Sequence, residues 1–249
     1  MSRTVVVSGG GTGIGLAAAR TFARDGDQVV LIGRRAEVLE RAAAELPGAV
    51  ACPADLTDPQ QVARAAHFVC EEYGAVDVLV NNAGGDGRLE ARGAAEDDPL
   101  AAVAGDWSLN FRLNVLTAVL LTEALRDHVA SPGGRVLFLG SIAALRGSGR
   151  NAYGSAKAAL HPYAFSLARE LGPRGITVNV VAPGYVEETG FFGGEVPEER
   201  RRALVAETLT GRAGHPGDIA ETLHWLASPH ADHITAQVIQ VNGGAERGR

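Results

Sequence analysis

The sequence is poor in cysteine, in long apolar runs and in positive charge. Its two cysteines, Cys52 and Cys70, stand in no CxxC pair and no Cys/His cluster, and no other metal-ligand spacing occurs, so we expect no metal site. We interpret both as packed, reduced thiols. No apolar run reaches the roughly 18 residues that a membrane span requires. The net charge of −6 supplies no basic surface for nucleic acid.

The start of the chain also lacks a targeting signal. The first ten residues, MSRTVVVSGG, contain neither the apolar stretch nor the cleavage site of a secretory signal peptide. Together with the reduced cysteines, this predicts a cytoplasmic protein that does not bind membranes.

The sequence does contain enough apolar material for a sizeable core. Hydrophobic residues make up 46% of the 249 positions and the mean hydropathy is +0.03, which is typical of a soluble protein. This length suits one large α/β domain or two small ones. Short apolar runs, unbroken as in parallel sheets, predict strands at 4–7, 28–32, 49–52, 76–80, 135–139, 176–181 and 238–241.

A glycine-rich segment follows the first expected strand and precedes a helical pattern that ends near Gly26. It reads SGGGTGIG from Ser8 to Gly15. A dinucleotide-binding fingerprint requires this order of strand, glycine loop and helix, because glycines let the backbone approach a pyrophosphate and the helix N-terminus supplies free N–H groups. We expect a cofactor here; the alternative is a glycine-rich turn without a ligand.

The end of the second expected strand indicates which nicotinamide cofactor fits. An NAD site usually has an acidic residue there, which binds the ribose 2′-hydroxyl. Here Gly33 takes that place, and Arg34 and Arg35 follow. Guanidinium groups suit a 2′-phosphate, so NADP(H) is favoured and NAD(H) stays open. The alternative is that both arginines are solvated at the start of a helix.

Three polar positions further along also suggest a site. Asp55 follows the third expected strand, where it can serve a ligand such as adenine. Asn81 begins a small-residue turn, Asn81–Gly84, which lets the backbone pass close to a cofactor. Asn114 interrupts an apolar helical stretch; it either orders a water that links Lys157 to solvent or bonds a neighbouring carbonyl.

The pair Tyr153 and Lys157 carries the clearest chemistry. Residues four apart lie on one face of a helix. An ammonium about 4–5 Å from a phenolate attracts it by roughly 3–4 kcal/mol at an effective dielectric of about 20, which lowers the pKa of the phenol. Such a phenol can exchange a proton with a carbinol oxygen, which Ser141, across a glycine-containing loop, can hold. The alternative is a solvated lysine beside a packed tyrosine.

Four further features shape this expectation. Asp58-Pro59 predicts a capped helix start, and 85–105 is expected to be a loop that either covers the site or is a solvated excursion. Pro162 should kink the helix that begins near Asn151. Residues 185–212 predict a substrate lid or a surface helix pair; as a lid, they would hold three aromatic rings over an apolar substrate: Tyr185, Phe191 and Phe192.

In this order, the motifs resemble those of a classical short-chain dehydrogenase/reductase, of the 3-oxoacyl-thioester reductase type, over nearly the whole chain. The matching pieces are SGGGTGIG at 8–15, Asp55, NNAG at 81–84, Asn114, Ser141, YGSAK at 153–157, Pro183-Gly184 and VNGG at 241–244. The resemblance implies one α/β Rossmann domain over residues 1–249, with a doubly wound, seven-stranded parallel sheet flanked by helices. It also implies a homotetramer or homodimer, with the helix bearing Tyr153 at a subunit interface.

The resemblance further implies which residues form the site. The catalytic tetrad would be Asn114, Ser141, Tyr153 and Lys157. The cofactor would be held by Gly9, Thr12, Gly13, Ile14, Gly15, Arg34, Arg35, Asp55, Leu56, Asn81, Ala83, Gly84, Tyr153, Lys157, Pro183, Gly184, Val186 and Thr189.

The sequence departs from the family pattern in three ways. Tyr153 follows Ser141 by twelve positions, one fewer than usual, so the loop between them must close more tightly. Thr189 lies one residue later than the threonine that family members use near the nicotinamide carboxamide. The 85–105 segment is longer than usual, and Pro162 interrupts the expected interface helix.

We therefore predict an NADP(H)-dependent oxidoreductase that transfers a hydride between the nicotinamide and a ketone or secondary alcohol, with Tyr153 as the general acid/base. The expected partner is a small, mainly apolar carbonyl compound or alcohol, and an acyl thioester stays open. Arg146 and Arg150 either receive an anionic carrier or are solvated. The alternatives are an NAD-dependent secondary-alcohol dehydrogenase of the same fold and a non-catalytic NADP(H)-binding protein.

Overall fold

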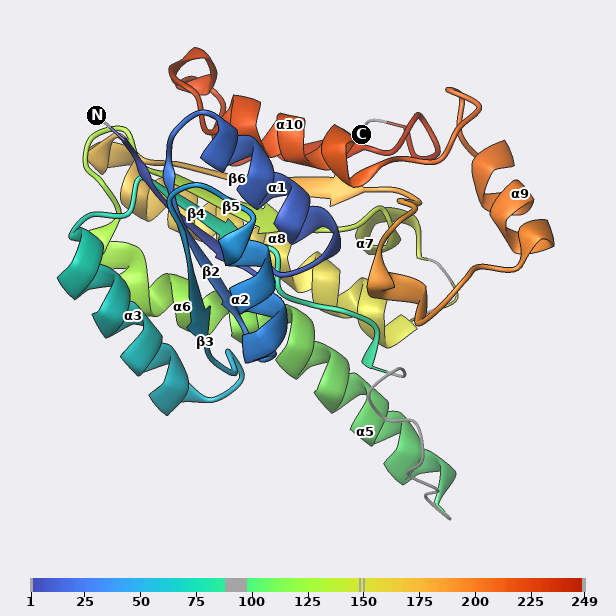
Figure 1. Ribbon diagram of the computed structural model, residues 1–249. Coiled ribbons are helices and arrows are strands. Elements are labelled where there is room, and N and C mark those ends of the chain that lie inside the picture. The colour runs from blue at the N-terminus through green and yellow to red at the C-terminus, as the bar shows by residue number, and fades with distance from the viewer. Residues whose placement is uncertain (1, 88–97, 148, 150, 248–249) are drawn as a thin grey trace.

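One seven-stranded sheet, in the order β3-β2-β1-β4-β5-β6-β7, runs through the molecule (Figure 1). The structure is a computed structural model that describes residues 2–87, 98–147, 149 and 151–247. Every pairing between neighbouring strands is parallel. The strands are β1 (Thr4–Ser8), β2 (Gln28–Gly33), β3 (Ala49–Pro53), β4 (Val78–Asn81), β5 (Arg135–Leu139), β6 (Thr177–Pro183) and β7 (Val238–Val241).

Helices cover both faces of the sheet, which confirms the predicted doubly wound α/β fold (Figure 1). The α-helices are α1 (Gly13–Arg24), α2 (Ala36–Ala44), α3 (Pro59–Tyr73), α5 (Pro99–Phe111), α6 (Thr117–Leu125), α7 (Ala143–Arg146), α8 (Asn151–Leu171), α9 (Glu198–Ala206) and α10 (Pro216–Leu226). Short 3-10 turns lie at Arg126–His128, Gly172–Arg174, Gly190–Phe192 and Pro229–Ala231.

The strands are apolar at nearly every position because they supply two cores at once. Successive side chains of a strand point to opposite faces. In β1, Val6 packs with α3, α6 and α8 on one face, whereas Val5 and Val7 pack with α1, α2 and α10 on the other. A sheet that is buried on both faces thus explains the unbroken apolar runs.

Several strand ends differ from the predicted ones. β1, β2 and β3 each run one residue further than expected, to Ser8, Gly33 and Pro53, because the ladder with the neighbouring strand continues through residues of low strand propensity. β6 extends to Pro183 in the same way. The fourth strand begins at Val78 instead of residue 76.

The prediction of a loop over 85–105 is wrong from Pro99 onward, where α5 begins. The Asp98 carboxylate accepts a hydrogen bond from the backbone N–H of Leu100, and Pro99 occupies the first turn. The same Asp-Pro signal correctly predicted α3, where Asp58 caps Gln60. Residues 88–97 of the predicted loop lie outside the described residues.

The interiors of two helices bear on the expected pattern. α8 runs from Asn151 to Leu171 with Pro162 in its interior, and the kink expected at this proline stays a prediction. The helical stretch after Asp106 is not one regular helix, because Arg112–Leu116 forms a π-helical turn between α5 and α6. Such turns often lie at functional sites, and this one contains Asn114.

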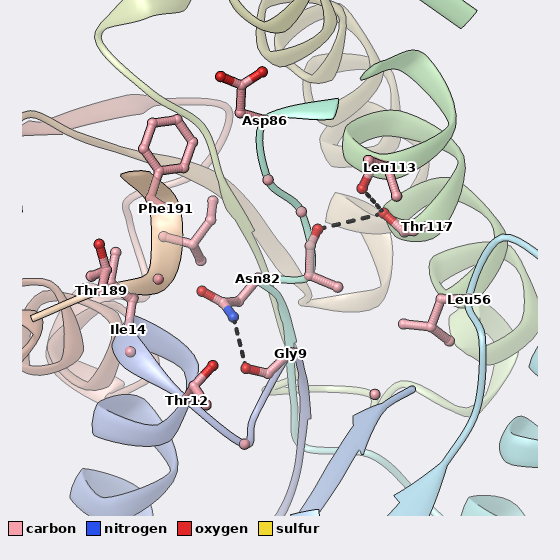
Figure 2. A pocket seen from close by; sticks show the side chains of 18 of the residues that line it. Gly9, Thr12, Ile14, Leu56, Asn82, Asp86, Leu113, Thr117, Thr189 and Phe191 are labelled. Carbon is pink, nitrogen blue, oxygen red and sulfur yellow. Dashed lines mark hydrogen bonds between the residues drawn. The ribbon is translucent and has the colours of Figure 1, made fainter. Parts of the chain in front are cut away.

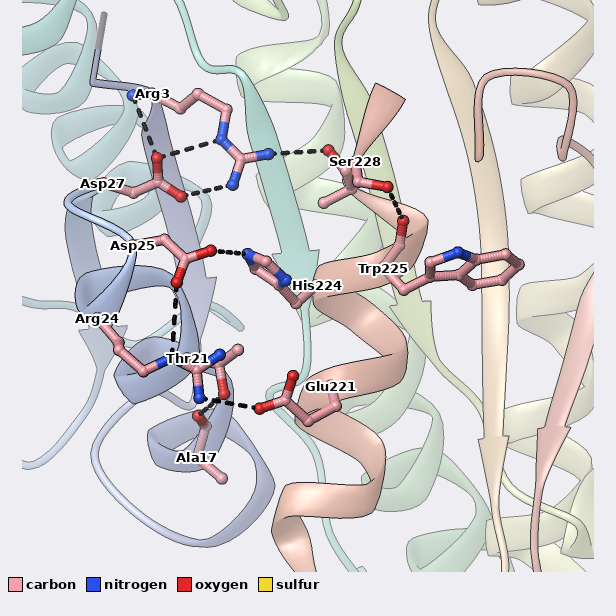
Figure 3. A network of polar contacts seen from close by, with 11 residues as sticks. Arg3, Ala17, Thr21, Arg24, Asp25, Asp27, Glu221, His224, Trp225 and Ser228 are labelled. Atoms are coloured by element: carbon pink, nitrogen blue, oxygen red, sulfur yellow. Dashed lines mark hydrogen bonds and ion pairs between the residues drawn. The ribbon is translucent and has the colours of Figure 1, made fainter. Parts of the chain in front are cut away.

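A polar network at the amino edge of the sheet joins the end of α1 to α10 (Figure 3). The Arg3 guanidinium donates to both oxygens of Asp27 and to the carbonyl of Ala227 at 2.8 Å. Arg24 pairs with Glu221 at 3.1 Å beside this contact. The network helps to hold α1, whose other end carries the glycine loop, against the body of the molecule.

Candidate active site

A cavity of about 490 Å³ opens at the carboxyl ends of the strands (Figure 2). Its walls include the segments that follow β1 and β4, the two neighbouring strands between which the strand order reverses. Open α/β sheets bind ligands at this switch point. Thr12 and Leu56 lie toward one end of the cavity, and Asp86 and Phe191 lie toward the other (Figure 2).

The glycine loop after β1 is shaped so that only glycine fits at two positions. A Cβ at Gly15 would lie 2.2 Å from the Gly9 carbonyl oxygen and 2.5 Å from Asn82 Nδ2. Gly9 has φ +66, and its Cβ would lie 2.7 Å from the same amide nitrogen. The loop therefore packs directly against the start of α1, and Gly13 and Ile14 at that helix end face the cavity. This cradle fits a pyrophosphate.

Polar side chains beneath the loop hold β1 and β4 in register at their ends. The buried Ser8 hydroxyl accepts hydrogen bonds from the backbone N–H groups of Asn82 and Ala83, both at 2.9 Å. In return, Asn82 Nδ2 donates to the carbonyls of Ser8 and Gly9 (Figure 2). The two loops that form the cavity floor are thus rigidly joined.

The cavity wall beyond β2 and β3 carries the charged groups of the expected adenosine end. Gly33, Arg34 and Arg35 line the wall, and both arginines are exposed. Asp55 Oδ1 accepts hydrogen bonds from the backbone N–H and the hydroxyl of Thr57, both at 2.9 Å. The residues present at this end thus fit a phosphorylated ribose and an adenine.

Ser141, Tyr153 and Lys157 line the same cavity. The Lys157 ammonium donates to the Leu139 carbonyl at 2.8 Å and is only 5% exposed. Burial lowers the pKa of Lys157 to about 8. The Ser141 hydroxyl accepts a hydrogen bond from the backbone N–H of Ala143 at 3.1 Å. The short interval between Ser141 and Tyr153 therefore still allows both side chains to reach one cavity.

Asn114 lies behind the cavity wall and does not line it. Its amide nitrogen donates to the carbonyls of Gly85 at 2.8 Å and Asn110 at 3.0 Å, and its oxygen accepts from the Gly85 N–H at 3.0 Å. Of the two roles weighed for this amide, bonding to a neighbouring carbonyl is confirmed. A Cβ at Gly84 would lie 2.6 Å from Asn114 Oδ1 and 3.1 Å from Lys157 Nζ, so both side chains pack against this glycine.

Aromatic rings of the 185–212 segment close one side of the cavity. The Phe191 ring lies 5.0 Å from the Tyr153 ring and 5.2 Å from that of Phe192, which in turn contacts Tyr185. Thr189 lines the cavity opposite Gly13, at 3.6 Å from the position of a Cβ there. The segment carries α9 and the 3-10 turn Gly190–Phe192.

The structure brings most of the predicted site residues together. The predicted residues that line the cavity are Gly9, Thr12, Gly13, Ile14, Arg34, Arg35, Asp55, Leu56, Ala83, Gly84, Ser141, Tyr153, Lys157, Pro183, Gly184, Val186 and Thr189. Gly15, Asn81 and Asn114 lie behind the wall. The Asn81 side chain donates to the Thr122 hydroxyl at 2.9 Å, and its neighbour Asn82 takes the place at the surface.

Sequence reasoning missed several wall residues: Asn82, Asp86, Leu113 and Thr117. Leu113 and Thr117 come from the π-helical turn and the start of α6, and no local pattern marks them. Thr117 donates to the Leu113 carbonyl at 2.8 Å and, more weakly, to that of Ala83 (Figure 2). Asp86 could have been identified from the sequence, because it is the first charged residue after the small-residue turn at 81–84.

Arg146 is not available to an anionic substrate in this arrangement. Its guanidinium bonds the Glu207 carboxylate and the Ala245 carbonyl. Arg150 lies outside the described residues. Within the described ranges, no three His, Cys, Asp or Glu side chains gather as metal ligands, and no helix there combines the length and apolarity of a bilayer span.

Comparison with known proteins identifies the family. The family profile described as "Enoyl-(Acyl carrier protein) reductase" matches residues 9–246. The chain is 34% identical over 248 residues to the succinyl-CoA dehydrogenase subunit BbsD of Thauera aromatica, whose full name specifies a hydroxy(phenyl)methyl substituent, and the match covers 98% of this chain and 96% of that protein. It is 33% identical over 247 residues to the 3-oxoacyl-(acyl-carrier-protein) reductase FabG of Escherichia coli, with 97% and 96% covered.

A solved structure agrees with this result. A blue fluorescent protein from a metagenomic library, in complex with NADPH, superimposes with a TM-score of 0.86 and 33% identity, over 98% of each chain. The match of sequence and fold spans nearly the entire chain, including the glycine loop and the helix with Tyr153 and Lys157. The chain therefore belongs to the short-chain dehydrogenase/reductase family of nicotinamide-dependent oxidoreductases.

Proposed function

We propose that this protein is an NADP(H)-dependent oxidoreductase that interconverts a ketone and a secondary alcohol. The observation that carries the proposal is that Ser141, Tyr153 and Lys157 line the same cavity as the glycine loop. The groups that would exchange a proton with the substrate and the loop that would bind the cofactor phosphates therefore face one cavity, where substrate and cofactor could be held side by side. When bound, NADP(H) supplies the hydride chemistry.

The protein's own residues position the carbonyl and move the proton. The hydroxyls of Ser141 and Tyr153 donate hydrogen bonds to the substrate oxygen, where negative charge develops as the carbonyl is reduced. Tyr153 then transfers its phenolic proton to that oxygen, and in the reverse direction the phenolate accepts the proton of the alcohol. The tilted Phe191 ring beside Tyr153 excludes water from this step.

Lys157 supports Tyr153 through its charge. With a pKa of about 8, the ammonium is mostly protonated at neutral pH and favours the phenolate form of its neighbour. The hydrogen bond to Leu139 holds the Nζ atom deep in the wall. Asn114 does not line the cavity and acts on its wall: its side chain bonds the Gly85 backbone, next to Gly84, which packs against Lys157.

The change Tyr153→Phe tests the catalytic role. It should reduce NADPH oxidation with any accepted ketone by at least about a hundredfold, the usual contribution of a general acid, while NADPH affinity, measured by fluorescence titration, stays within about threefold. Tyr163→Phe is the matched control, because Tyr163 lies on the same helix but bonds Glu123 at 2.7 Å. Near-parental turnover in Tyr153→Phe would reject the mechanism. If the unmutated protein binds NADPH but reduces no ketone, the alternative of a non-catalytic NADP(H)-binding protein is favoured.

We further propose a preference for NADP(H) over NAD(H). The support is Gly33 at the end of β2, where an acidic side chain would repel a 2′-phosphate, with Arg34 and Arg35 beside it on the cavity wall. The change Arg34→Ala should raise the Kd for NADPH at least about tenfold and leave the Kd for NADH within about threefold. Arg41→Ala is the control, because Arg41 is an exposed arginine further along the chain, in α2, and does not line the cavity. Equal losses for both cofactors would favour the NAD-dependent alternative.

We also propose that two or four copies of the chain assemble. α5 carries a row of exposed apolar side chains, Leu100, Val103, Trp107 and Phe111, and Phe165 on α8 is exposed as well. α5 extends away from the body of the molecule (Figure 1), and Asn110 is its one residue that is classed as buried. A helix with so little buried surface needs a second surface to cover its apolar side.

A further inference from the structure

The backbone adopts an uncommon conformation where the 185–212 segment reaches the cavity. Glu188 has φ +57, in the left-handed region that residues with a side chain seldom occupy. The next residue, Thr189, lines the cavity beside the glycine loop, 3.6 Å from the position of a Cβ at Gly13 (Figure 2). Because a backbone outlier of this kind persists only where its surroundings hold it, the contacts of Glu188 bear on where Thr189 lies.

Backbone hydrogen bonds fix the residues just before Glu188. Val186 forms a parallel bridge with Gly214, which precedes α10. The Gly214 N–H donates to the Tyr185 carbonyl at 2.9 Å, and the Glu187 N–H donates to the Gly214 carbonyl at 3.0 Å. The start of the segment is therefore joined to the chain at the beginning of α10.

The Glu188 side chain makes a second connection to the same helix. Its carboxylate oxygen Oε2 lies 3.1 Å from Nε2 of His215, the N-cap residue of α10. The other ring nitrogen, Nδ1, accepts a hydrogen bond from the Gly217 N–H at 3.0 Å. A ring nitrogen that accepts carries no proton, so the proton of the neutral imidazole is on Nε2 and is donated to Glu188.

The helix that follows in the segment contributes little to this arrangement. No residue of α9 is classed as buried, and α9 stands apart from the sheet (Figure 1). Its Arg201 donates to the Glu187 carboxylate at 3.1 Å, so α9 is itself tied to the start of the segment. The bonds of residues 185–188 are therefore what orients the chain ahead of Thr189.

We propose that Glu188 and His215 are positioning residues that hold Thr189 over the glycine loop, on the wall that a bound NADP(H) would contact. This inference rests on the proposed function, because it concerns the binding of its cofactor. Without the bond, Glu188 would relax toward a more common backbone conformation and Thr189 would turn away from the loop. Both side chains are largely exposed, 71% for Glu188 and 58% for His215, so the bond makes a modest contribution that is local to this segment.

The test removes the hydrogen bond from each side. Glu188→Ala deletes the acceptor; His215→Asn deletes the donor and keeps a favoured N-cap residue on α10. Each change should raise the Kd for NADPH, measured by fluorescence titration, at least about threefold. The KM for NADPH should rise by the same factor while kcat with an accepted ketone stays within about twofold. Since both changes remove one bond, the double variant should lose no more affinity than either single variant.

A conservative variant distinguishes this bond from a purely structural effect. Glu188→Gln keeps an acceptor for the Nε2 proton and should bind NADPH nearly as the parent does. The controls are Glu199→Ala and His230→Asn, which change exposed residues of the same types elsewhere and should also bind NADPH normally. Equal losses in Glu188→Gln and Glu188→Ala, additive losses in the double variant, or equal losses in the controls would overturn the proposal.

Hydrogen exchange separates this inference from the proposed function. The amides of Glu187 and Gly214 form the bridge beside Glu188, and in the protein without cofactor they should exchange at least about threefold faster in Glu188→Ala than in Glu188→Gln. If the parent binds no NADPH, the proposed function fails and these exchange rates decide the inference: faster exchange in Glu188→Ala supports the positioning role, and equal rates overturn it.

Discussion

Lys157 is the only lysine of the sequence, although the chain has 23 basic residues of the lysine and arginine types. Arginine supplies all other positive side chains, including those on the exposed surface. An arginine cannot replace Lys157 in its role, because a guanidinium stays charged and is too broad for a point contact with one phenol and one carbonyl. The ammonium is compact, and burial moves its pKa within reach of physiological pH.

This burial predicts a pH-dependent stability. The pKa of Lys157 is lowered from 10.5 to about 8 in the folded protein, so between these values the unfolded state binds more protons and stability rises with pH. Relative to Lys157→Met, the free energy of unfolding of the parental protein should rise by up to roughly 3 kcal/mol across this window, as measured by urea unfolding. Below pH 8 the difference should be constant.

A spectroscopic measurement provides the control for this prediction. Because the chain has one lysine, protein made with isotope-labelled lysine gives a single set of side-chain resonances. Their titration midpoint in the folded protein should lie near pH 8, and in urea near 10.5. A midpoint that stays near 10.5 in the folded state would contradict the lowered pKa.

At the scale of the element, the helical stretch from α5 to α6 contains an irregular turn that contributes residues to the cavity wall. A regular helix presents residues four apart on one face, and Asn110 and Asn114 use that spacing to hold Gly85 and Gly87. The π-helical turn Arg112–Leu116 then brings Leu113 and Thr117 to the cavity wall. Asn110 and Asn114 are buried because their side chains supply hydrogen-bond partners to the backbone of Gly85 and Gly87. Buried backbone groups outside regular helices and strands need such partners.

The change Asn110→Leu should therefore destabilise the protein by about 1–3 kcal/mol, the cost of leaving the buried Gly87 N–H without an acceptor. Chemical denaturation measures the loss, and hydrogen exchange at Gly87 should become faster than in the parent. Ser108→Leu, at an exposed position of the same helix, is the matched control and should be nearly neutral. Equal effects of the two changes would show that Asn110 has no anchoring role.

At the scale of the whole molecule, a row of apolar side chains on α5, with Phe165 on α8, is exposed among the described residues of a single copy of the chain. Trp107 is 47% exposed and Phe111 46%, in the same row of side chains as Leu100 and Val103. Tyr153 and Lys157 lie on α8 as well, so an interface there would also stabilise the catalytic helix. The proposed assembly and the proposed catalysis would then be linked through one element.

We expect the parental protein to sediment as a dimer or tetramer. The double change Trp107→Glu and Phe111→Glu should shift it toward monomers in analytical ultracentrifugation, because charges in an apolar interface lose their hydration. Phe68→Glu, a partly exposed aromatic residue on α3, is the control and should leave the assembly intact. A parental monomer at micromolar concentration would contradict the proposed assembly.

Much of the architecture was accessible from local patterns alone. Apolar runs of four to six residues predicted all seven strands, because strands buried on both faces leave a continuous signal, as the three valines of β1 illustrate. The glycine loop and the spacing of Tyr153 and Lys157 indicated the site, since both depend on short-range geometry. Asp98-Pro99 was an equally local signal, and the start of α5 was missed because the acidic residues before it resembled a loop.

Other features depended on contacts between distant segments. Whether Asn81 or Asn82 faces the cavity is decided by the bonds of Ser8 to the β4 end and of Asn81 to Thr122, and the position of Asp86 is decided by two asparagines more than twenty residues away. Residue order thus determined the strands and the placing of Tyr153 and Lys157 on one helix face, because these rest on periodicity and near neighbours. The choice of which polar side chains reach the cavity belonged to the tertiary structure, because buried donors and acceptors must find partners that only folding brings close.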